Sequence, residues 1–128
     1  MSGDRDSDRS GERPPFEIRE RTFLFAARTI RLTRGFPKSV DAIEVGRQLV
    51  RAATAIGANV EEAHGAESKR DLVHKMSIAC KEARETRYWL RLVKATIGGD
   101  GEPDSLLQES DEIMRIPSTI VAKSRQKE

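Results

Sequence analysis

The sequence predicts an all-α protein, specifically an antiparallel up-down-up-down four-helix bundle. Apolar residues recur at three- and four-residue spacing along four segments, as they do on the buried faces of helices. The turns between the segments are short, which forces neighbouring helices to run antiparallel. At 128 residues with 37% hydrophobic content, the chain is long enough for one core and too short for two. We therefore expect a single helical domain over residues 16–125.

The first residues, MSGDRDSDRSGERPP, contain no Leu, Ile, Val or Phe. Charges of both signs alternate there with Ser, Gly and Pro. A segment with no apolar surface to bury does not fold by itself. We therefore expect a disordered tail over residues 1–15.

The first helix is expected at about residues 16–34, where Gly35-Phe36-Pro37 ends it because proline cannot continue the helical hydrogen bonds. Its apolar stripe is formed by Phe23, Ala26, Ile30 and Thr33, with Phe25, Arg28 and Leu32 on the flank.

The second helix is expected at about residues 39–64, with Ser39 as its N-cap. Two adjacent seams at heptad spacing predict burial over a wide arc. The first seam is Val45, Leu49, Ala52, Ile56, Asn59 and Ala63, and the second is Gly46, Val50, Ala53, Gly57, Val60 and His64. The small residues Gly46, Ala53 and Gly57 should let another helix come close.

The third helix is expected at about residues 68–97, between an N-cap at Ser68 and the break Gly98-Gly99-Asp100-Gly101. Its core stripe is regular: Leu72, Met76, Ala79, Ala83, Thr86, Leu90, Val93 and Ile97. The fourth helix is expected at about residues 103–123, with Pro103 in its first turn. Pro117 lies inside its pattern and should kink it or split it in two.

Charge and composition limit the classes of function that the protein can have. The net charge is only +2, from 23 basic and 21 acidic residues, so a nucleic-acid footprint must be a local patch. The single cysteine, Cys80, fits a reducing compartment. No segment approaches the roughly 20 apolar residues of a membrane span, and the N-terminus lacks the apolar core of a signal peptide. We expect a soluble cytoplasmic protein that does not contact membranes.

Phosphate-binding loops and the usual zinc motifs are absent from the sequence. We therefore expect a protein that is not an enzyme and needs no cofactor.

Several polar residues fall on seams that should be buried. They are Arg51, Asn59, Glu62, Lys75, Glu82, Glu85 and Thr86. The acids could be catalytic, but carboxylates do acid–base work only in a pocket that admits substrate, and the sequence indicates none. We favour the alternative, a hydrogen-bond and ion-pair network that fixes helix register or a subunit contact.

Two acid–histidine pairs flank the turn between the second and third helices. Glu61 and His64 form one Glu-x-x-His pair, and Asp71 and His74 form an Asp-x-x-His pair. Bundles that hold two iron ions use two Glu-x-x-His pairs with two further glutamates. Here the pairs lie at a helix hairpin and one acid is Asp, so we favour a surface ion-pair cluster over a metal site.

A basic stripe on the third helix is the strongest functional candidate. Arg84, Arg87, Arg91 and Lys94 recur on one face, Lys81 adjoins them, and Arg47 lies on the second helix. Between Ser68 and Ile97, eight basic residues stand against three acids, a local charge of +5. Such a face can contact phosphates of RNA or DNA. It can equally be a solvated face with internal ion pairs, and the sequence leaves that choice open.

Three segments carry a resemblance to a known family: Phe36–Lys38, Gln48–Ser68 and Lys75–Leu90. The most specific runs are RAATAIGANVEE, starting at Arg51, and KEARETRYWL, starting at Lys81. The chain resembles the four-helix-bundle proteins first recognised as reading frames inside bacterial 23S ribosomal RNA intervening sequences. The resemblance covers roughly residues 16–122, and Arg51, Asn59, Glu62, Lys75, Glu82 and Glu85 occupy positions that the family pattern also uses.

The resemblance implies a bundle that assembles into a ring, usually a homopentamer. The accessory proteins of diversity-generating retroelements are similar in fold, and those pentameric barrels bind nucleic acid and a reverse transcriptase. The leading hypothesis is thus a non-catalytic homo-oligomer that binds RNA or DNA, or accompanies a reverse transcriptase, through its basic faces. The alternatives are a protein-interaction scaffold and, third, a metal-binding bundle.

Overall fold

The computed structural model describes residues 15–126, and every regular element in that range is a helix. The helices are α2 (Pro15–Arg34), α3 (Val40–His64), α4 (Lys69–Thr96), α5 (Glu102–Ile113) and α6 (Arg115–Gln126). The all-α prediction is confirmed for the described residues. The predicted disordered tail lies outside them, apart from Pro15, which begins α2.

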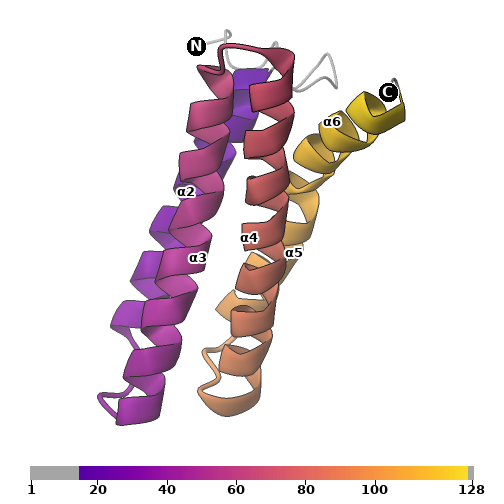
Figure 1. Ribbon diagram of the computed structural model, residues 1–128. Coiled ribbons are helices and arrows are strands. Elements are labelled where there is room, and N and C mark those ends of the chain that lie inside the picture. Colours follow the sequence, from indigo (N-terminus) through magenta and orange to yellow (C-terminus); the bar gives the residue numbers. More distant parts are fainter. Residues whose placement is uncertain (1–14, 127–128) are drawn as a thin grey trace, which may run out of the picture.

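The long helices pack side by side, and α5 and α6 together take the place of a fourth (Figure 1). In Figure 1 the α2–α3 turn and the α4–α5 connection lie at one end of the molecule, and the α3–α4 turn lies at the other. Helix α3 packs against α2 and α4, while α4 also packs against α5 and α6. Helix α6 diverges from the rest of the bundle toward the C-terminus.

The core-facing side of α2 differs from the predicted stripe. Phe25 is fully buried, whereas Phe23 is 64% exposed. The buried side also contains Thr22 and Thr29, whose hydroxyls donate to the carbonyls of Ile18 (2.8 Å) and Phe25 (2.9 Å). Because these hydroxyls are satisfied within the helix, threonine can occupy the core without an unpaired polar group. The predicted stripe of Phe23, Ala26 and Ile30 lies on the outer side of the helix.

The wide buried arc predicted for α3 is confirmed, with eight residues buried from Ala42 to Ala63. The glycines of α3 allow α2 and the residues that follow it to pack closely. A Cβ atom at Gly57 would lie 3.3 Å from Thr22 Oγ1, and one at Gly46 would lie 3.4 Å from the Phe36 ring. The predicted core stripe of α4 is confirmed from Met76 to Val93.

The fourth predicted helix is split, as Pro117 suggested, but the break precedes the proline. Helix α5 ends at Ile113 and α6 begins at Arg115. Pro117 has no N–H to donate to the carbonyl four residues back, that of Ile113, so the helix is interrupted there. The chain can therefore change direction at this break, and α6 packs against α4 separately from α5.

Serine side chains cap the N-termini of α3 and α4. Ser39 accepts from the Ala42 N–H at 3.4 Å, and Ser68 accepts from the Asp71 N–H at 3.0 Å. The α4–α5 connection contains Gly98, Gly99 and Asp100 with positive φ angles of 87°, 123° and 54°. Within the described part of the chain, no helix combines the length and hydrophobicity of a membrane-crossing segment.

Candidate nucleic-acid interface

The six predicted phosphate-contacting residues divide into two groups in the structure. Arg87, Lys94 and Arg47 each pair with an acid. Arg87 Nη1 lies 2.9 Å from Asp111 Oδ1 and Lys94 Nζ lies 2.8 Å from Asp104 Oδ1, both across the α4–α5 interface. Arg47 Nη2 lies 3.3 Å from Glu44 Oε1, one turn earlier on α3.

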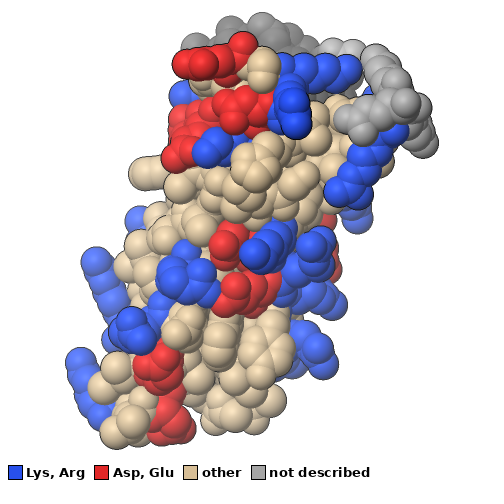
Figure 2. Space-filling model, viewed as in Figure 1, with Lys and Arg blue, Asp and Glu red and all other residues tan. Residues whose placement is uncertain are grey.

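The other three, Lys81, Arg84 and Arg91, are exposed on α4. Among the side chains that the structure describes, none of these three has an acid within ion-pair distance. Successive members of this set are three and seven residues apart, so they line one side of the helix. Figure 2 shows basic and acidic side chains interspersed over the middle of the visible face.

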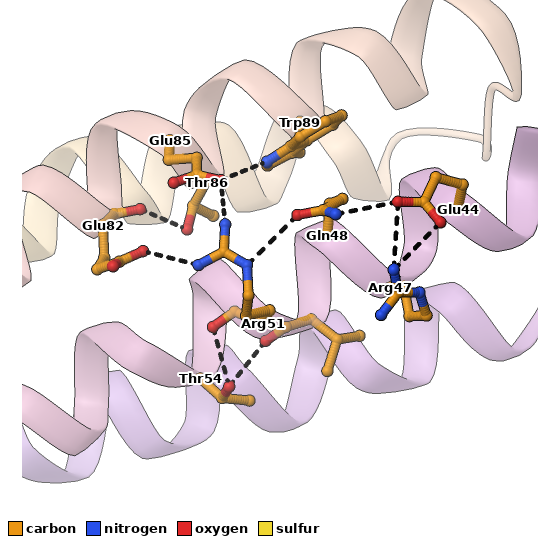
Figure 3. Close-up of polar contacts among 10 residues, drawn as sticks. Glu44, Arg47, Gln48, Arg51, Thr54, Glu82, Glu85, Thr86 and Trp89 are labelled. Atoms are coloured by element: carbon orange, nitrogen blue, oxygen red, sulfur yellow. Dashed lines mark hydrogen bonds and ion pairs between the residues drawn. The ribbon is translucent and has the colours of Figure 1, made fainter.

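The structure joins three of the seven residues of the predicted polar network across α3 and α4 (Figure 3). Arg51 pairs with Glu85 and approaches Glu82, with Nη1 3.5 Å from Oε1. Glu85 also accepts from the Trp89 indole N–H at 3.1 Å. One guanidinium therefore ties two acids on the neighbouring helix, an arrangement that restrains the relative rotation of α3 and α4.

The remaining four residues of that set make separate contacts. Lys75 Nζ lies 2.7 Å from Glu62 Oε1, which raises the pKa of Lys75 through the hydrogen bond and the charge of Glu62. Asn59 donates to the Ala55 carbonyl of its own helix at 2.8 Å, and the Thr86 hydroxyl donates to the Glu82 carbonyl at 2.8 Å.

The expectation that the whole set is buried is wrong. Thr86 is buried, but the side chains of Arg51 and Glu62 are 50% and 60% exposed. The α3–α4 seam is wide enough to keep small residues inside and long charged side chains at its edge, with their heads in water.

The four metal-ligand candidates do not converge. Glu61 pairs with Arg19 of α2 at 2.9 Å, and His64 and His74 are exposed. Within the described residues, no three His, Cys, Asp or Glu side chains are close enough to share a metal ion.

Helix α6 supplies a basic residue that sequence reasoning missed. Arg125 lies with Lys81 and Arg84 along one groove between α4 and α6. The available signal was composition, because the segment RIPSTIVAKSRQ contains three basic residues and no acid.

The outer side of α2 and α3 carries an apolar groove of about 410 Å³. Its lining is formed by Arg19, Phe23, Ala26, Ala27, Ile30, Thr54, Gly57, Ala58 and Glu61. Phe23 stands at 64% exposure there, and the neighbouring Leu24 is 49% exposed. A strip of this kind is typical of a surface that contacts another protein.

The described residues form a small helical bundle with a basic face on α4 and an exposed apolar groove on α2 and α3. The chain belongs to the family described as 23S rRNA-intervening sequence proteins, whose model matches residues 15–118. A crystal structure of a protein of unknown function from the S23 ribosomal protein family of Bacteroides thetaiotaomicron is similar. It is 32% identical, with a TM-score of 0.74, over 81% of this chain and 97% of that chain. Comparison with curated proteins gives no match.

Proposed function

We propose that this protein is a non-catalytic, homo-oligomeric four-helix bundle of up-down-up-down topology that binds RNA through the basic face of α4. The observation that carries the proposal is the set Lys81, Arg84 and Arg91, exposed on one side of α4 without acid partners among the described side chains. The family description, which refers to an intervening sequence of 23S ribosomal RNA, supports RNA as the polyanion.

Binding of this kind is led by charge. Arginine offers a planar fork of donors that matches phosphate oxygens, and lysine contributes a point charge. Each phosphate contact releases bound counterions, so the affinity should fall steeply with salt. Because the net charge of the chain is only +2, long-range attraction between the whole protein and RNA is weak. The affinity for RNA therefore depends on the local cations that have no acid partner among the described side chains.

Self-association would raise the affinity for RNA above that of a single subunit. We place the subunit contact on the apolar groove of α2 and α3, with a second copy of this chain as the occupant. Phe23 is an exposed aromatic anchor, and the small side chain of Ala58 in the groove lining is exposed as well. The family resemblance implies a pentameric ring, which would repeat the α4 face around its axis and convert weak contacts into tight binding.

The same apolar groove favours a second candidate function, a protein-interaction scaffold. In that case the groove would hold a different protein, such as a reverse transcriptase, and the α4 cations would only solvate the surface. The two candidates differ in what they predict for RNA binding by the purified protein.

The deciding experiment is a salt titration of RNA binding, with the mass of the protein measured in the same buffer by light scattering. The double substitution Arg84→Gln with Arg91→Gln should weaken binding at least about tenfold and flatten the salt slope. The matched control is Arg87→Gln with Lys94→Gln, which removes equal charge from ion-paired residues and should weaken binding less. A protein that binds no RNA at low salt would rule out the proposal and leave the scaffold.

A further inference from the structure

Helices α4 and α6 face each other across a groove with a matched pattern of side chains. Its lining on α4 is Ser77, Cys80, Lys81 and Arg84, and on α6 it is Ser118, Val121, Ala122 and Arg125. Both sets follow the spacing i, i+3, i+4, i+7, which is one continuous side of a helix. The groove therefore runs along both helices for about two turns.

Small residues in its lining keep the groove open. Ser77, Cys80, Ser118 and Ala122 leave a space of about 400 Å³, within the range of about 300–1,000 Å³ that is usual for small-molecule sites. The Cys80 Sγ and Ser118 Oγ atoms are 3.6 Å apart, so the two helices come close at this level. Serine hydroxyls line both sides and can donate hydrogen bonds to an oxygen-rich ligand.

The charges along the groove are all positive. Lys81, Arg84 and Arg125 are exposed, and none of them has an acid within ion-pair distance among the described side chains. Helix α6 has no acid to offer, because its sequence RIPSTIVAKSRQ contains only basic and neutral residues.

The other long helix interfaces are built differently. An ion pair bridges each of them: Arg19–Glu61 between α2 and α3, Arg51–Glu82 between α3 and α4, Arg87–Asp111 between α4 and α5, and Arg21–Glu109 between α2 and α5. In the described part of the molecule, the α4–α6 interface has cations on both helices and no bridging acid. Like charges on both sides of one groove repel unless an anion lies between them.

We propose that the α4–α6 groove is an oxyanion site that receives a phosphate group, and that the backbone phosphate of bound RNA is its ligand. Arg84 and Arg125 would bind the phosphate oxygens from opposite helices, Lys81 would add its charge, and Ser77 and Ser118 would donate hydrogen bonds from the two sides of the groove. Only the RNA part rests on the proposed function. The α6 side from Val121 to Arg125 lies beyond the residues matched by the family model.

The direct test is a titration of the full chain with inorganic phosphate. Binding is measured as changes in the backbone amide chemical shifts in TROSY spectra, and chloride at equal ionic strength is the reference. Phosphate should shift the amides of residues 77–84 and 118–125 in a saturable manner. Lys81→Gln with Arg125→Gln should weaken this binding at least about tenfold. The matched control is Arg70→Gln with Lys123→Gln, which removes the same charges from α4 and α6 outside the groove and should leave the phosphate shifts unchanged. Shifts equal to those with chloride, or equal losses in both variants, would overturn the oxyanion site.

A second arm separates the site from the proposed function by measuring single-stranded RNA binding to the same three proteins. Weaker RNA binding by the groove variant alone is the expected result. Equal RNA binding by all three would overturn the assignment of RNA to the groove while leaving RNA binding intact. Phosphate binding in the groove without any RNA binding by the unaltered protein would overturn the RNA ligand and the proposed function together, leaving a free phosphate group as the ligand.

Discussion

The pairing of Arg87 with Asp111 allows a gain-of-binding test. Arg87 Nη1 donates to both Asp111 oxygens, at 2.9 and 3.0 Å, and the two side chains are 49% and 56% exposed. The substitution Asp111→Asn removes the acid charge and releases Arg87 on the α4 face that carries Arg84 and Arg91. If free cations determine RNA binding, this variant should bind more tightly than the unaltered protein.

The magnitude follows from the exposure of the pair. An exposed ion pair contributes about 0.2–1 kcal/mol, so the melting temperature should fall by no more than about 6 °C. One additional phosphate contact per subunit should steepen the slope of log K against log salt by about 0.7 for single-stranded RNA. We expect a rise in affinity of about three- to tenfold at low salt, since the new contact is charge-assisted but largely exposed.

The assay is fluorescence anisotropy of a labelled single-stranded RNA over a series of salt concentrations. Asp100→Asn is the control because it removes the same charge from an exposed residue for which no ion pair is seen. Its backbone φ of 54° is tolerated by asparagine, so the α4–α5 connection should be preserved. Equal effects of the two substitutions, or an unchanged salt slope for Asp111→Asn, would refute the reasoning that the paired cation is masked.

Four further predictions concern the bundle itself. Phe25→Ala should lower the free energy of unfolding by about 3–5 kcal/mol in urea denaturation, because the ring is fully buried. Phe23→Ala, at 64% exposure, should instead weaken self-association in light scattering, and a core-sized loss of subunit stability would contradict the observed orientation of α2. Ser68→Ala should cost about 0.5–2 kcal/mol through loss of the cap on Asp71 N–H, and an unchanged urea midpoint would argue against it. Hydrogen bonding with the Ser39 side chain holds the pKa of Asp41 below its ordinary value of 3.8. The ionised carboxylate therefore stabilises the fold above that value and loses its effect as the pH falls through the folded-state pKa, which an NMR titration would show as a midpoint below 3.8.

The sequence was most informative for α3 and α4. The α4 stripe from Met76 to Val93 keeps one spacing with apolar and small residues, so its buried side can be predicted from periodicity alone. Helix α2 has apolar residues on two sides, and its core contains Thr22 and Thr29. Because a hydroxyl bonded to its own helix is compatible with burial, polarity did not indicate which side faces the core.

The candidate site was predictable only in part, for a geometric reason. A stripe of cations on one helix follows from spacing, but their partners lie on other helices and depend on the relative rotation and height of those helices. Arg87 and Lys94 are neutralised by Asp111 and Asp104 of α5, a pairing that no spacing rule within α4 could indicate. Arg125 joins the free cations only because Pro117 redirects the chain and α6 packs on α4.

The central claim is that RNA contacts α4 and α6, and photo-crosslinking measures the location of that contact directly. RNA containing a photoreactive uridine would be crosslinked to the purified protein, and the modified peptides would be identified by mass spectrometry. The account predicts crosslinks in residues 77–91 of α4 and 115–126 of α6, with few in α2. Crosslinks concentrated on the outer side of α2 and α3, or none at salt concentrations where RNA is bound, would contradict it.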